Sequence, residues 1–185
     1  KADFVYFTKT SFLMKKISTI LKPLESESHH FQTYLGTGLH TLGLLGWILE
    51  QTGRADVYVS TFSTSDAFLS GFLRLRKKNL IAHSVLLADL KASRKTINLY
   101  RLMRNCFDDV FLGMNHSKIV LVHNDGWMVS VITSQNQTYG DRAECTMVTT
   151  DKGTFLSLMA GLKQIVENKS IQMDGLFNRL SSETT

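Results

Sequence analysis

The sequence contains little proline or cysteine. Only one proline occurs among its 185 residues, so we expect no long disordered linker. The two cysteines, Cys106 and Cys145, form neither a close pair nor a CxxC motif, which argues against a zinc site. We therefore expect reduced, buried thiols in a cytoplasmic protein, with no metal and no cofactor.

Long apolar runs are also absent. The longest, at 39–49, is interrupted by Thr41, Gly43 and Gly46 and is far shorter than the roughly 20 residues that cross a bilayer. We therefore expect no membrane partner. The charge is mildly basic, with 21 Lys and Arg against 16 Asp and Glu and a formal net charge of +5. Such a balance permits binding of a polyanion such as nucleic acid without requiring it.

Helical and strand periods alternate along the chain, which indicates an α/β protein. Strands expected at 55–62, 80–88 and 110–114 are separated by helices expected at 66–78 and 93–106, a pattern typical of parallel pairing. The other expected elements are strands at 3–7, 117–123, 127–133 and 145–150, and helices at 11–21, 39–51, 151–168 and around 173–180. We expect a single domain over residues 1–185, built on a mixed, mostly parallel central β-sheet flanked by helices on both faces.

Polar residues gather between positions 115 and 144. His116 and Lys118 alternate at the start of a strand, so both side chains project from the same face. An Asp-Gly pair at 125–126 predicts a hairpin turn, after which Ser134 and Asn136 follow the returning strand. Pairing of the two strands would bring all four polar side chains to one end of the sheet.

These residue types can carry out phosphoryl transfer without a metal. An imidazole such as His116 can attack phosphorus when a neighbouring carboxylate stabilises its charged form, and Glu144 is the natural candidate for that carboxylate. Lys118, Ser134 and Asn136 can stabilise the charge that builds on the phosphate oxygens. Other interpretations stay open: Ser134 and Asn136 could cap a turn, and Glu144 could pair with a basic neighbour on the surface.

The segment also resembles a known family. His116, Ser117 and Lys118, followed by Ser134, Gln135 and Asn136, are similar to the HxK…D…GSxN motif of the phospholipase D superfamily. The stretch VYVSTFSTSDAFLSGF resembles the first strand and helix of bacterial members, and the resemblance covers about half of the chain, from 55 to about 151.

The chain departs from the family motif at two positions. His123 stands where the family has its aspartate, with Asp125 two residues further on, and Thr133 replaces the glycine before the serine. Because the family's aspartate mainly supports local structure, Asp125 could take its place after a shifted turn. Loss of His116 or Lys118 would weigh more against activity than these changes do.

The resemblance implies a phosphodiesterase with a phosphohistidine intermediate. The family uses two HxK motifs around one axis, whereas this chain has one, so the resemblance implies a homodimer that shares a site containing His116 from each subunit. DNA is the favoured substrate, since single-motif bacterial relatives and the basic charge both point to it, and an endonuclease is the favoured activity. Two alternatives are a catalytically degenerate nucleic-acid-binding module and, less favoured, a phospholipid-hydrolysing enzyme.

Overall fold

The computed structural model describes residues 17–26, 30–90, 93–138 and 142–175. The strand expected at 3–7 lies outside these residues. Of the helix expected at 11–21, residues 17–20 are helical, and of the helix expected around 173–180, residues 173–175 are helical. The remaining positions of both lie outside the described residues, apart from Leu21, which follows the first helix.

The described residues form one eight-stranded sheet with the order β1-β7-β6-β5-β2-β3-β4-β8. The strands are β1 (Phe31–Gly36), β2 (Ala55–Thr61), β3 (Ile81–Asp89), β4 (Asp109–Gly113), β5 (Ile119–Asn124), β6 (Trp127–Thr133), β7 (Glu144–Thr149) and β8 (Ser170–Gln172). The helices are α2 (Thr41–Thr52), α3 (Asp66–Lys77), α4 (Ser93–Cys106) and α5 (Lys152–Lys169).

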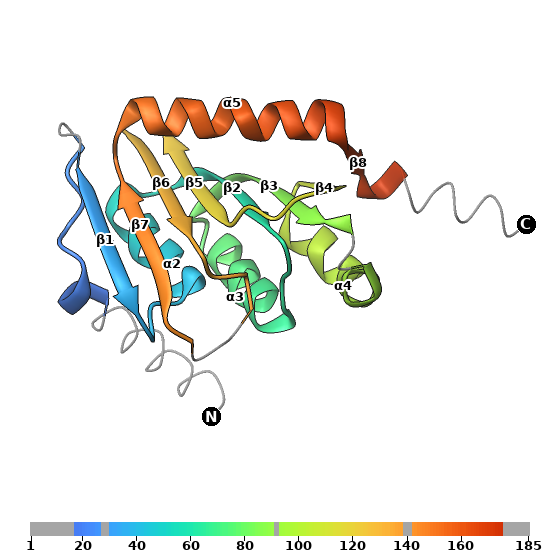
Figure 1. Cartoon of the computed structure of the whole chain (residues 1–185), viewed down its shortest axis with the longest axis horizontal. Coiled ribbons are helices and arrows are strands. Elements are labelled where there is room, and N and C mark those ends of the chain that lie inside the picture. Colours follow the sequence, from blue (N-terminus) through green and yellow to red (C-terminus); the bar gives the residue numbers. More distant parts are fainter. Residues whose placement is uncertain (1–16, 27–29, 91–92, 139–141, 176–185) are drawn as a thin grey trace, which may run out of the picture.

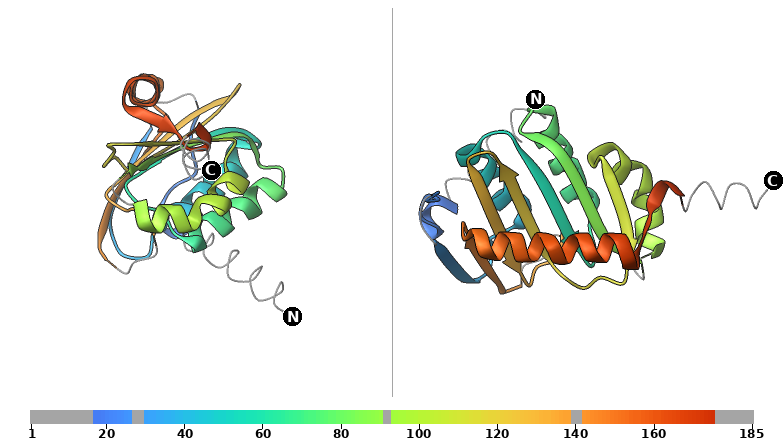
Figure 2. Two further views of the ribbon diagram at one scale, coloured as in Figure 1. Left: turned by 90° about the vertical axis from the view of Figure 1, so that its right-hand side faces the viewer. Right: turned by 90° about the horizontal axis from the view of Figure 1, so that it is seen from above.

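Helices cover both faces of this sheet, as predicted. Helices α2, α3 and α4 lie on one face, and the long α5 crosses the other (Figures 1 and 2). A large apolar cluster that includes Ile48, Phe72 and Val120 fills the first interface, and a smaller one that includes Leu121 and Phe155 fills the second. Neighbouring residues of β5 thus point to opposite faces, as the pleat of a strand requires.

The prediction that the sheet is mostly parallel is wrong. Only β2–β3 and β3–β4 are parallel, joined by the crossover helices α3 and α4. The other five pairs are antiparallel. The reason is that the strands directly after β4 are not joined by crossover helices. β5 and β6 form a hairpin with a two-residue turn at 125–126, and short hairpin connections permit only antiparallel neighbours.

Two local features define the ends of helices. Ser65 is the N-cap of α3, and its side chain accepts a hydrogen bond from the Phe68 N–H. Gly53 ends α2 with a φ of 77°, a left-handed value that glycine adopts without strain. The sequence analysis missed two strands, β1 and β8.

A glycine also sets the contact between α2 and α3. A Cβ atom added at Gly71 of α3 would overlap the Leu42 side chain of α2. The absence of a side chain at this position therefore lets the two helices approach closely. By contrast, a Cβ atom added at Gly161 in α5 would meet nothing within 4 Å.

Candidate functional site

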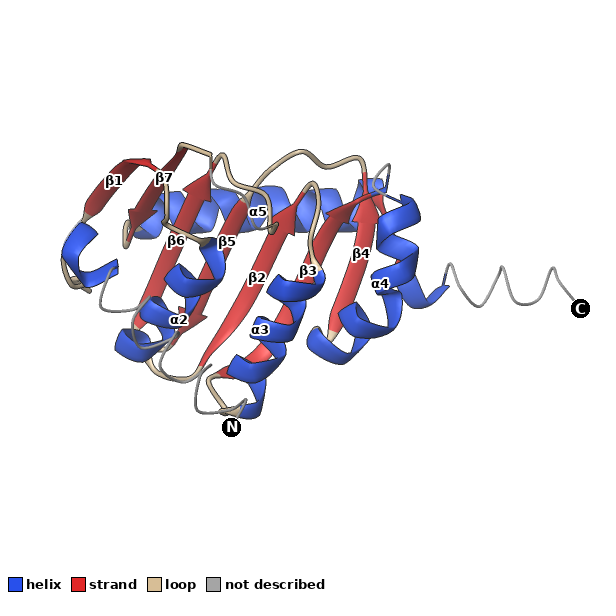
Figure 3. Ribbon diagram, turned by 90° about the horizontal axis from the view of Figure 1, so that it is seen from below, coloured by secondary structure: helices blue, strands red, loops and turns tan. Residues whose placement is uncertain are grey.

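The candidate site lies where the chain leaves the parallel part of the sheet. Residues 114–118 connect β4 to β5, and since β3 and β2 lie between these strands, the connection crosses their carboxyl ends (Figure 3). Three strand spacings of about 4.8 Å amount to roughly 14 Å, about two-thirds of the roughly 20–22 Å that six fully extended Cα–Cα steps span. The edge at the carboxyl ends of parallel strands is where α/β sheets commonly bind ligands.

Asn115 anchors this connection. Its side chain is buried, and its Nδ2 donates to Ser60 Oγ at 2.9 Å, Thr61 O at 3.2 Å and Leu87 O at 3.3 Å. Its backbone N–H donates to the buried carboxylate of Asp89 at 2.9 Å. One asparagine thus ties the connection to both β2 and β3.

Ser117 is held by the same group of residues. Asn115 Oδ1 accepts from the Ser117 N–H at 3.1 Å and from its hydroxyl at 2.7 Å. The hydroxyls of Ser117 and Ser60 are 2.6 Å apart. Because the residues on both sides of His116 are fixed to the sheet, the backbone of His116 has little freedom. The sequence analysis missed this role of Asn115; its only local signal was an asparagine directly before the motif.

His116 and Lys118 lie together, as their spacing predicted. Lys118 Nζ donates to the His116 carbonyl at 2.7 Å and lies 3.4 Å from His116 Nδ1. The exposed His116 ring packs against Phe62, with ring centroids 5.0 Å apart, and Lys118 Nζ lies 5.9 Å from the centroid of the same ring. Phe62 was not predicted to take part. It follows β2 at the same edge of the sheet.

Glu144 and Ser134 complete a connected group with this pair. Burial lowers the pKa of Lys118, and the negative charge of Glu144 acts in the opposite direction, raising it. The carboxylate of Glu144 accepts a hydrogen bond from the Ser134 hydroxyl, which in turn accepts from the Cys145 N–H at 3.0 Å. His116 thus contacts Lys118 and Ser134 contacts Glu144, and the two pairs are joined by the charge of Glu144 acting on Lys118 and by the backbone bond between Thr133 and Lys118. Glu144 engages Ser134 within the subunit, and a role as partner of His116 stays a prediction.

Thr133 fits the position where the family has glycine. Its backbone N–H donates to Lys118 O at 3.0 Å, so Thr133 lies opposite the motif lysine and Ser134 follows directly after it. Its hydroxyl lies 2.9 Å from that of Thr146 in β7 and accepts from the Gln135 N–H at 3.1 Å. This departure adds hydrogen bonds that a glycine could not make.

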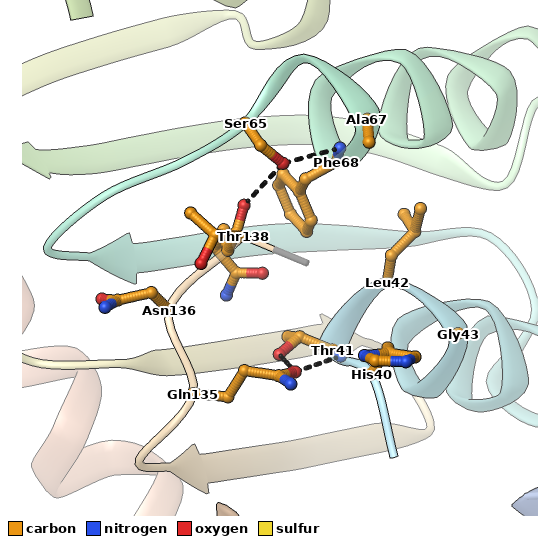
Figure 4. A pocket seen from close by; sticks show the side chains of 11 residues that line it. His40, Thr41, Leu42, Gly43, Ser65, Ala67, Phe68, Gln135, Asn136 and Thr138 are labelled. Carbon is orange, nitrogen blue, oxygen red and sulfur yellow. Dashed lines mark hydrogen bonds between the residues drawn. The ribbon is translucent and has the colours of Figure 1, made fainter. Parts of the chain in front are cut away.

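Asn136 lies to one side of the connected group. The preceding residue, Gln135, turns its side chain to the start of α2, where its Oε1 accepts from the N–H and hydroxyl of Thr41, both at 3.0 Å. Asn136 lines a pocket next to that helix end (Figure 4). Its Oδ1 is buried and without a hydrogen-bond partner among the residues that the structure describes.

His123 lies at the other end of β5, away from the candidate site. It pairs with Asp56 at the start of β2, and its ring stacks on Phe155 with centroids 5.7 Å apart. Asp125 is exposed in the turn, and the supporting bonds come from Asn124, whose Nδ2 donates to the carbonyls of residues 52 and 54 at 2.9 and 3.1 Å. Asn124, and not Asp125, thus makes the contacts that hold this end of the strand.

The cysteines are both free, but only one is buried. Cys106 is buried, which raises its pKa to about 11. Cys145 is exposed at the start of β7, so the expectation of two buried thiols is wrong for this residue, because it stands near the strand end beyond the cover of the helices. Across the described part of the chain, no group of three or more His, Cys, Asp or Glu side chains could hold a metal ion.

The comparison with solved structures defines the class of fold. Nuc from Salmonella typhimurium, a phospholipase D family member, superposes with a TM-score of 0.56 at 13% identity, over 77% of this chain and 98% of that one. NucT from Helicobacter pylori gives 0.55 at 14% identity, over 76% and 98%. The chain therefore has the fold of the phospholipase D superfamily, as its motif predicted.

The same fold also occurs in larger proteins. Phosphatidylserine synthase from Haemophilus influenzae matches with a TM-score of 0.55 at 13% identity, over 77% of this chain but 39% of the synthase. No protein-family model and no curated protein sequence matches this chain. At such low identities the likeness establishes the fold alone. Within the residues described, no helix is both long and apolar enough to span a bilayer.

Proposed function

We propose that the protein is a metal-independent phosphodiesterase that cleaves nucleic acid, with DNA as the favoured substrate and endonuclease as the favoured activity. The observation that carries the proposal is the connected group of His116, Lys118, Ser134 and Glu144 at the carboxyl ends of β2 and β3. An imidazole and an ammonium group 3.4 Å apart, with a carboxylate whose charge acts on the ammonium and which binds a hydroxyl, suit a tetrahedral anion better than they suit a structural role.

The proposed reaction has two displacements at phosphorus. A ring nitrogen of His116 attacks, the bond from phosphorus to the leaving oxygen breaks, and that oxygen takes a proton from a second imidazole. The second imidazole then removes a proton from water, whose oxygen displaces His116 from phosphorus. Lys118, Ser134 and Asn136 stabilise the negative charge on the oxygens that stay bound to phosphorus.

The second imidazole is proposed to be His116 of a second copy. One histidine has to act as nucleophile while another is protonated, so the two must differ in charge and titrate as a coupled pair. Only one histidine of this chain is followed two residues later by a lysine. A twofold dimer supplies the second histidine from an identical surface.

The net charge helps to distinguish between the possible substrates, whereas the fold does not. The formal net charge of +5 favours a polyanion over a neutral lipid surface. The fold does not separate the alternatives, since it occurs in phosphatidylserine synthase as well. A nucleic-acid-binding module without catalysis would keep the basic charge but would not need the imidazole of His116.

A plasmid-nicking assay with EDTA tests this proposal. Wild-type protein should nick supercoiled DNA, His116→Ala should lose at least about a thousandfold in rate, and the control His123→Ala at the opposite end of β5 should stay active. Cleavage by wild type and His116→Ala alike would mean a contaminant or another site. Binding without cleavage by wild type would favour the non-catalytic module, and hydrolysis of phospholipid vesicles instead of DNA would favour the lipid enzyme. Light scattering that finds only monomers in the active sample would contradict the shared site.

A further inference from the structure

A pocket borders the candidate site on the side of Asn136. It lies between the first turns of α2 and α3, with residues 135–138 as its third wall (Figure 4). Much of its lining is apolar, from Leu42, Ala67 and Phe68. Its volume is about 150 Å³, comparable to a protein cavity that accommodates one benzene ring.

Gln137 gives this pocket an unsatisfied polar group. The residue lines the pocket and is 2% exposed, and neither the nitrogen nor the oxygen of its side-chain amide has a partner among the described residues. Its backbone is well held: the N–H donates to Ser63 O at 3.0 Å, and the carbonyl accepts from the Ser65 hydroxyl at 3.1 Å. A buried amide with no hydrogen bond is unfavourable, so a ligand offering both a donor and an acceptor would be stabilised here once the Gln137 side chain turns its covered amide toward the pocket.

A nucleobase has this combination of properties. Its faces are flat and apolar, and its edge carries a donor next to an acceptor, which a glutamine amide can pair with in a bidentate way. Ligand pockets commonly join apolar walls with a few polar groups in this manner. Asn136, to which the proposed reaction assigns a phosphate oxygen, also lines the pocket, so a group bound in the pocket would lie next to that phosphate.

We infer that this pocket binds one unstacked nucleobase beside the phosphate that is cleaved, which makes single-stranded nucleic acid the preferred substrate; the inference rests on the proposed function. A base within a duplex is stacked and paired, and has to be flipped out of the helix to enter. In this arrangement the pocket binds the base of one nucleotide, and its phosphate is bound by the connected group of His116, Lys118, Ser134 and Glu144.

Cleavage of abasic oligonucleotides tests the inference. The substrates are single strands that each carry one abasic residue at a different position relative to the cleaved bond. The kcat/KM for each is compared with that for the intact strand. In wild type, one position should show a loss of at least about tenfold, the scale of one base contact. Gln137→Leu should reduce this base-dependent ratio to about threefold or less, and Ala67→Leu, which fills the pocket, should bring it close to one.

Two controls separate binding from folding. Gln137→Leu should not lower the melting temperature, since the buried amide that it replaces makes no hydrogen bond that would be lost. Gln164→Leu on the exposed surface of α5 should keep the wild-type ratio. A wild-type scan without any sensitive position, or a Gln137→Leu ratio equal to that of wild type, would overturn the pocket assignment while leaving the nuclease proposal intact. Failure of wild type to cleave any oligonucleotide would overturn both.

Discussion

Asn115 should control catalysis although it is buried behind the reacting groups. In Asn115→Ala the three hydrogen bonds from Nδ2 are lost, together with those that Oδ1 accepts from Ser117. Nδ2 carries two N–H groups that share these three acceptors, so at about 1 kcal/mol for each buried bond the donor side amounts to about 2 kcal/mol of the free energy of unfolding. The Ser117 hydroxyl keeps its contact with Ser60, which limits the further cost.

The effect on rate should exceed what unfolding explains. Without the Asn115 side chain, the backbone on the amino-terminal side of His116 keeps only the bond from its own N–H to Asp89, and a displacement of about 1 Å can lower a rate about a hundredfold. We therefore expect kcat to fall about a hundredfold at a temperature where urea titration shows the variant to be folded. KM should change much less, because the groups that bind phosphate remain.

Asn124→Ala is the matched control. It removes an asparagine with two carbonyl contacts from the other end of the same strand, and should lower stability without changing kcat. Equal losses of kcat in the two variants would show that stability, and not placement of His116, limits the rate. A folded Asn115→Ala protein with wild-type kcat would refute the anchoring role altogether.

The remaining predictions concern pH and packing. Because burial lowers the pKa of Lys118, the unfolded chain binds more protons than the folded protein between that lowered value and about 10.5, and stability from Lys118 rises with pH there. In urea titrations from about pH 8 to about pH 11, the stability of wild type relative to Lys118→Met should therefore rise with pH, since Cys106, whose raised pKa acts in the opposite direction, is common to both proteins; a difference that does not change with pH would exclude a contribution from Lys118. Gly71→Ala should lower stability by about 1–3 kcal/mol through overlap with Leu42, whereas Gly161→Ala should raise it by up to about 1 kcal/mol, both by thermal melting. Equal effects would contradict the packing argument.

Periodicity predicted the elements that bury one face. The helix expected at 93–106 and the strand expected at 127–133 have the observed bounds. β1 was missed because none of its residues is buried: its positions alternate between exposed and half-buried, and its large apolar residues Phe31 and Leu35 face outward. β8 has three residues, too few for a pattern. That the chain is a single domain over all 185 residues stays a prediction.

The candidate site was predictable only where its residues are close in sequence. His116 and Lys118 lie in contact, as their spacing predicted, and the hairpin pairs Thr133, the residue before Ser134, with Lys118. The anchoring of Asn115 depends on Ser60 and Leu87, residues 55 and 28 positions away, and no local pattern records such contacts. The same holds for the pocket at Gln137, whose walls come from three separate segments.

The central position of β5 ties activity to the integrity of the whole sheet. This strand follows directly from the loop that carries His116, yet it joins the parallel strands only through β2, more than fifty residues earlier in the chain. Closing a loop of that length is entropically costly, and the cost is offset only when the surrounding strands assemble together. Local fraying near the surface would leave His116 and Lys118 in place, whereas separation of β5 from β2 would disperse them. Loss of activity on heating should therefore coincide with cooperative melting of the protein rather than precede it.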